Sequence, residues 1–99
     1  LAFQLVTKII FLNERINEAF ALADKKELSK ALNAFTAILE NLDKSYSGIE
    51  GLLYINIIKL AIETGDDRKA QEMYSKLRLS DAPRLSSYLK FLNEQGIRY

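Results

Sequence analysis

Residues 53–83 read LYINIIKLAIETGDDRKAQEMYSKLRLSDAP, and this stretch predicts two helices joined by a tight turn. In its first part the apolar residues recur every three or four positions, at Leu53, Ile57, Leu60 and Ala61. Gly65 ends this helix, since glycine adopts the left-handed conformation beyond a helix end at little cost. Asp66-Asp67 then suits the free N–H groups at the start of a second helix, so we expect a helical hairpin.

Further helices are expected on both sides of this hairpin. Upstream, a long helix covers residues 1–23, and Asp24-Lys25-Lys26-Glu27 matches a capping box that opens a second helix. Ser47-Gly48-Ile49-Glu50 repeats that pattern at the start of the helix that leads to Gly65. Downstream, Pro83 is expected in the first turn of a last helix. Because the connections are only about two to five residues long, the sequence predicts one all-α domain over 1–99, with five antiparallel helices.

The first helix carries more apolar surface than one helix face needs. Its main stripe consists of Leu5, Ile9, Leu12, Ile16, Phe20 and Ala23. A second side of its early part is also apolar, at Phe3, Val6, Ile10 and Phe11. These four residues are either covered by the following helices or are candidates for self-association. Since Lys8 interrupts the apolar run, we expect no direct membrane insertion; the first residue is Leu, so we expect the chain to begin inside a longer gene product.

Composition excludes several kinds of chemistry. The 99 residues include no Cys and no His, so thiol nucleophiles, imidazole bases and the usual zinc sites are ruled out. The closest carboxylate pairs, Asp66-Asp67 and Glu14 with Glu18, are explained by a helix start and a solvated turn. Fourteen basic against thirteen acidic side chains argue against a nucleic-acid partner. We therefore expect no catalytic site, no cofactor and no metal site.

From Leu53 to Pro83 the chain resembles a tetratricopeptide repeat. The residues that carry the resemblance are Tyr54, Ile57, Ile58, Ala61, Gly65-Asp66, Ala70, Tyr74, Leu77 and Ala82-Pro83. Tyr88 follows Tyr54 by 34 residues, the period of that family, and Phe91 matches Ile57. Upstream, Ala31, Phe35 and Ile38 echo Ala70, Tyr74 and Leu77 at an offset of 39 residues. Ile58 and Leu77 depart from the small residues that the family favours, so the repeats over 24–95 are degenerate.

The resemblance implies a right-handed α-solenoid fragment of stacked helix hairpins that holds a protein or peptide in a groove. The groove positions carried over from the family are Leu52, Ile55, Asn56, Lys59, Ser86, Leu89, Lys90 and Asn93. The alternative is that these residues form solvated helix faces. Tyr54, Tyr74 and Tyr88 are expected to fill the core, and Tyr46 and Tyr99 are given no role.

Two functions follow as expectations. The first is a non-catalytic interaction module that binds a peptide or protein partner in this groove. The second is a structural domain that forms a homodimer through its apolar N-terminal helix. Degenerate arrays of this kind are similar to the soluble domains of bacterial membrane-anchored tetratricopeptide-like proteins, which implies a place in the bacterial cytoplasm or facing the envelope.

Overall fold

Five helices follow one another in the computed structural model, which describes residues 2–43, 47–80 and 82–99, with backbone only at 2–9 and 47. The helices are α1 (Ala2–Asp24), α2 (Leu28–Glu40), α3 (Ser47–Glu63), α4 (Asp67–Arg78) and α5 (Leu85–Glu94). Within these described ranges the chain forms no strand. The prediction of an all-α protein is therefore confirmed.

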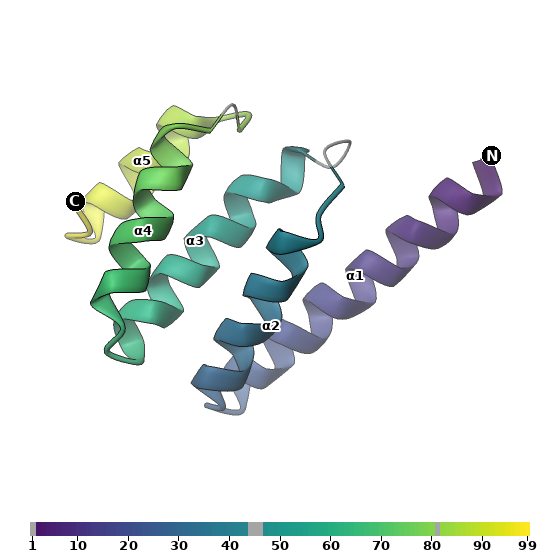
Figure 1. Cartoon of the computed structure of the whole chain (residues 1–99), viewed down its shortest axis with the longest axis horizontal. Helices are drawn as coiled ribbons and strands as arrows, with labels where there is room; N and C mark the ends of the chain where they lie inside the picture. Colours follow the sequence, from purple (N-terminus) through teal and green to yellow (C-terminus); the bar gives the residue numbers. More distant parts are fainter. Residues whose placement is uncertain (1, 44–46, 81) are drawn as a thin grey trace.

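Helix α3 lies at the centre of the packing. It contacts α2, α4 and α5, whereas α1 packs on α2 alone among the described elements. Figure 1 shows α1 to α4 side by side in chain order, with α5 behind α4 and the N-terminal end of α1 extending past α2. A helix enclosed in this way must be apolar on nearly every side, and the buried residues of α3 are Leu53, Tyr54, Ile55, Ile57, Ile58, Leu60 and Ala61.

The turn after α3 forms as the sequence predicts. Gly65 has a φ of 82°, and the Asp66 N–H donates to the carbonyl of Ala61 at 2.8 Å, which ends the helix in a Schellman-type turn. The Asp66 side chain accepts the backbone N–H of Lys69 at 3.2 Å and caps α4. Ala70, in the first half of α4, is fully buried, and so small a side chain lets the two helices approach closely.

Two predicted helix starts are wrong. The expected capping box at Asp24 does not form, because α1 continues through Asp24 and Glu27 is the N-cap of α2 without a side-chain hydrogen bond. The chain turns there at Lys26, whose φ is 64°. Pro83 does not lie in the first turn of α5, because Arg84 has a φ of 61° and the helix starts only at Leu85. The side-chain cap expected at Ser47 lies outside the described part of the chain.

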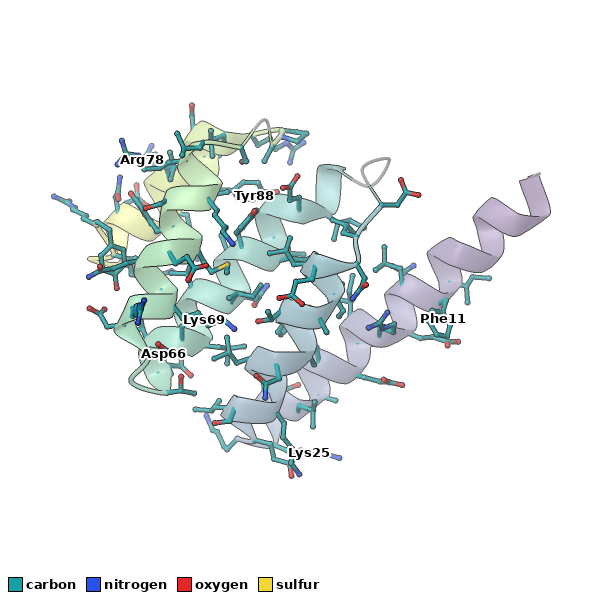
Figure 2. All side chains as sticks on the ribbon, viewed as in Figure 1. Phe11, Lys25, Asp66, Lys69, Arg78 and Tyr88 are labelled. Atoms are coloured by element: carbon teal, nitrogen blue, oxygen red, sulfur yellow. The ribbon has the colours of Figure 1, made fainter. Side chains whose placement is uncertain are left out.

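Gly51 determines how closely α5 approaches α3. The residue is buried in α3, and a Cβ atom at this position would overlap the ring of Tyr88 from α5. Figure 2 shows Tyr88 beside the N-terminal part of α3. The aromatic ring therefore occupies the space that any other residue at position 51 would fill with its own side chain.

We expect Gly51→Ala to lower the melting temperature. Alanine improves intrinsic helix propensity by about 1 kcal/mol, but overpacking of this kind costs about 1–3 kcal/mol, so the overlap with Tyr88 prevails. Thermal unfolding followed by circular dichroism measures the effect.

Gly48→Ala is the matched control, because Gly48 lies in the same helix and a Cβ atom there would meet nothing within 4 Å. This change should leave stability unchanged or raise it. If both variants raise the melting temperature equally, Tyr88 does not pack against Gly51 as described.

Candidate functional site

Three of the four predicted groove residues of α3 lie along its outward side. Leu52 is 42% exposed, and Asn56 and Lys59, four and seven positions later, are half-buried on the same side of the helix. Ile55 is buried. The Asn56 side chain donates to the carbonyl of Leu52 in its own helix at 2.9 Å, so one of its amide hydrogens is already used.

Lys59 joins this surface to α5 through an aromatic ring. Its ammonium nitrogen lies 5.5 Å from the centroid of the Phe91 ring, within the range of a cation–π contact. The structure shows no carboxylate paired with Lys59 among the described residues. Sequence reasoning missed Phe91 as a surface residue, because the repeat aligned it with Ile57, a core position.

One predicted groove residue of α5, Asn93, does not share this surface. It accepts a hydrogen bond from the Tyr74 hydroxyl of α4 at 3.0 Å. Since residues two apart point about 200° apart around a helix, Asn93 faces α4 while Phe91 faces Lys59. Of the other predicted groove residues of α5, Lys90 is exposed and lies 4.0 Å from Glu94, Leu89 is half-buried, and Ser86 is exposed. The structure thus brings Lys59 to Phe91 and places Asn93 against α4.

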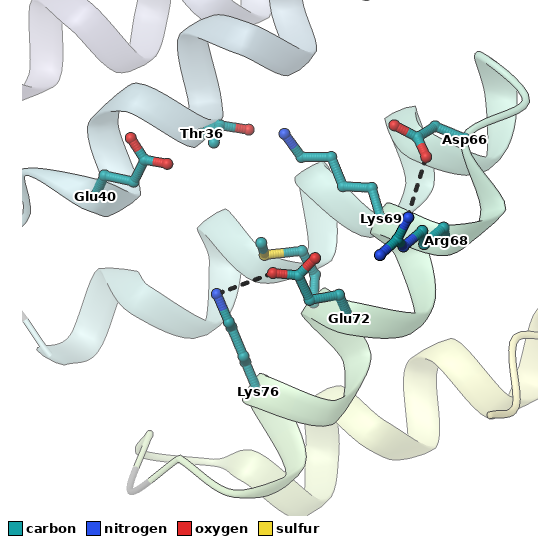
Figure 3. A pocket seen from close by; sticks show the side chains of 8 residues that line it. Thr36, Glu40, Asp66, Arg68, Lys69, Glu72 and Lys76 are labelled. Carbon is teal, nitrogen blue, oxygen red and sulfur yellow. Dashed lines mark hydrogen bonds and ion pairs between the residues drawn. The ribbon is translucent and has the colours of Figure 1, made fainter.

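A groove that the sequence did not indicate lies between α2 and α4. It encloses about 320 Å³ and is lined by Thr36, Glu40, Asp66, Arg68, Lys69, Glu72, Met73 and Lys76 (Figure 3). Met73 is buried and is the apolar member of this lining. The rest of the lining consists of three cationic side chains, three anionic side chains and Thr36. The groove requires α2 and α4 to flank the same helix, which no local sequence pattern reveals.

The charged residues of the α2–α4 groove differ in their partners. Lys76 pairs with Glu72 at 3.3 Å, and Asp66 caps α4. The Lys69 ammonium makes neither an ion pair nor a hydrogen bond with the described residues, and Figure 3 shows it extending toward Thr36. The Thr36 hydroxyl donates its hydrogen to the carbonyl of Leu32 at 2.7 Å and keeps its oxygen as an acceptor.

The early part of α1 presents apolar side chains to solvent. Ile10 is 54% exposed and Phe11 is 59% exposed, with the Arg15 guanidinium 6.0 Å from the Phe11 ring centroid. Figure 2 shows Phe11 far from α3, α4 and α5. The side chains of Phe3 and Val6, the other two candidates for self-association, lie outside the described part of the structure.

The described residues contain no group of three or more acidic side chains placed to hold a metal ion. No helix in the described part of the chain is long and apolar enough to cross a membrane.

Tyr99 has a structural role that the sequence did not suggest. Its hydroxyl donates to Asp67 at 2.7 Å, and its ring packs edge-on against Tyr74 with the centroids 5.6 Å apart. The hydrogen bond to Asp67, assisted by partial burial and by the charge of that carboxylate, raises the pKa of Tyr99 to about 12. Burial followed by the charge of Glu50 also raises the pKa of Tyr54, so both phenols remain neutral at physiological pH.

Comparison with protein-family models, curated proteins and solved structures gave no match for this chain. The function is therefore inferred from the geometry of these surfaces.

We expect Tyr99→Phe to lower stability by about 1 kcal/mol or less, because the hydrogen bond to Asp67 is exposed. The phenol of the folded protein has a pKa of about 12 against an ordinary value of 10.0, so the fold favours the protonated form. The wild type should keep its full stability advantage over Tyr99→Phe below about pH 10 and lose that advantage as the pH rises toward 12. Urea unfolding of both proteins from neutral pH to about pH 12 measures this difference.

The two proteins differ only at position 99, so the difference in stability between them isolates the phenol of Tyr99. An advantage that persists unchanged at the highest pH would contradict the assignment of the hydrogen bond.

Proposed function

We propose that the chain is a non-catalytic interaction module that binds a peptide or protein segment on the surface shared by α3 and α5. In this proposal the helices form antiparallel hairpins stacked in a right-handed solenoid, as in tetratricopeptide repeats. Three features support it: the tight turn at Gly65, the fully buried Ala70, and the contact of α3 with both α4 and α5. Successive first helices of such repeats pack side by side in this way.

The observation that carries the proposal is the contact between Lys59 and Phe91. It places a cation, an aromatic ring and the exposed Leu52 on neighbouring parts of one surface. Aromatic residues are enriched where proteins bind partners, and a lysine beside the ring adds charge recognition to the apolar contact. A segment with an acidic residue next to an apolar residue suits this combination, because Lys59 has no carboxylate partner of its own in the described structure.

Selection from a displayed library of random peptides tests this function. Wild-type protein should enrich peptides that pair acidic with apolar residues. Lys59→Ala should weaken binding of a selected peptide about fivefold, because a partly solvated ion pair contributes about 1 kcal/mol. Fluorescence anisotropy of the labelled peptide measures the affinity.

Lys30→Ala is the control, because Lys30 is exposed on α2 and its removal changes the net charge equally. Binding should then remain as in wild type. The proposal is wrong if no peptide is enriched, or if the Lys30 and Lys59 variants bind equally well.

Self-association through α1 is a second candidate function. It is favoured by the exposure of Ile10 and Phe11 on a helix that packs on α2 alone among the described elements. Two such helices from separate copies would cover each other's apolar side.

We expect the double variant Ile10→Glu, Phe11→Glu to convert a dimer into a folded monomer, because burying carboxylates in an apolar interface is costly. Sedimentation equilibrium over a range of concentrations measures the mass. Leu79→Glu is the control, since Leu79 is 87% exposed but follows α4, and this variant should remain dimeric. Wild-type protein that is monomeric at every concentration would exclude this function.

A further inference from the structure

We propose that the groove between α2 and α4 is a second binding site, in which Lys69 holds the carboxylate of an acidic residue in an extended peptide. This site is separate from the α3–α5 surface and stands independently of the function proposed for it. The argument rests on which groups in the groove are already used and which remain available.

Lys69 differs from most other lysines of the protein. Among the lysines whose side chains the structure describes, only Lys59 and Lys69 are half-buried; the rest are exposed. Lys59 lies over the ring of Phe91, whereas Lys69 contacts no acceptor among the described residues. A cation partly removed from water without a partner is stabilised by any anion that joins it, and more strongly than at a fully exposed position.

The charges that line the groove differ in whether they are paired. Three cationic and three anionic side chains line it, so the groove carries no net charge. Glu72 and Lys76 pair at one end, and the Asp66 carboxylate accepts the first-turn N–H of α4 and keeps its charge. Arg68 is exposed, so Lys69 is the half-buried cation of the groove without an ion pair among the described residues. A carboxylate therefore gains most when it lies beside Lys69.

Thr36 and Met73 indicate that the carboxylate belongs to a peptide. Because the Thr36 hydroxyl gives its hydrogen to Leu32, it can only accept a further hydrogen bond, and a peptide N–H is a suitable donor. The buried Met73 offers an apolar, adaptable contact for the methylene groups of an acidic side chain. A volume of about 320 Å³ has room for one such residue and its neighbours rather than for a folded partner.

The experiment titrates the full 99-residue chain with three probes and follows backbone amide signals by nuclear magnetic resonance. The probes are acetyl-Ala-Glu-Ala-amide, its neutral counterpart acetyl-Ala-Gln-Ala-amide, and sodium acetate. We expect the Glu peptide to shift the signals of Thr36, Lys69 and Met73 in a saturable way. The Gln peptide should bind at least about tenfold more weakly, since a hydrogen bond to a charged group contributes about 1.5–3 kcal/mol.

Variants identify the group that binds. Lys69→Met keeps an unbranched, mostly apolar side chain but removes the ammonium group, and it should abolish the shifts. Lys69→Arg keeps the charge and should retain them. Lys30→Met removes the same charge outside the groove and should leave the affinity unchanged within about twofold, because Lys30 is exposed and pairs with Glu27. Melting temperatures of all three variants establish that they are folded.

Three outcomes overturn the proposal. The first is the absence of any shift with the Glu peptide, and the second is binding that persists in Lys69→Met. The third is equal affinity for acetate and the Glu peptide, which would make the site one for free carboxylates and not for a peptide. Lys59→Ala alters only the α3–α5 surface, so the Glu peptide should bind this variant as it binds wild type. This result shows that either site can fail its test without affecting the other.

Discussion

The burial of α3 on almost every side is the constraint on which the other helices depend. Leu53, Ile57 and Ile58 are fully buried; Leu53 and Ile57 share one face, but Ile58 points about 100° away from Ile57, so a single neighbour cannot cover all three. Burying one such side chain contributes about 1.5–3 kcal/mol, and the net stability of a small domain is about 5–15 kcal/mol. Loss of any one of the covering helices α2, α4 or α5 would therefore expose a large fraction of the stabilising surface.

The same requirement explains why the protein leaves apolar surface at one end. In sequence, both the first and the third helix are apolar on more than one side, but only α3 is enclosed. Helix α1 packs on α2 alone among the described elements, whereas three helices cover α3. Part of the apolar surface of α1 therefore has no helix against it. Exposed Ile10 and Phe11 are the direct consequence. The distinction between a central helix and an edge helix lies in how the helices pack, and the hydrophobic pattern of either helix does not contain it.

The sequence predicted what local physical chemistry determines. The structure confirms the five α-helices, the turn at Gly65 and the cap at Asp66. Each of these features depends on residues that are close together in the chain. The predicted starts at Asp24 and Pro83 are wrong because Lys26 and Arg84 adopt positive φ angles. Such angles are uncommon outside glycine, so a pattern of residue types gives little warning of them.

The candidate site was less accessible to prediction, because its residues come together only through distant contacts. The rotation of α5 about its own axis decides which of its residues accompany Lys59. That rotation is fixed by the ring of Tyr88 against Gly51 and by the hydrogen bond from Tyr74 to Asn93, which link residues far apart in the chain. The repeat register assigned Phe91 to the core and Asn93 to the groove, whereas the structure places Phe91 beside Lys59 and Asn93 against α4. The α2–α4 groove likewise arises from two helices that flank α3, and its set of lining residues cannot be read from either helix alone.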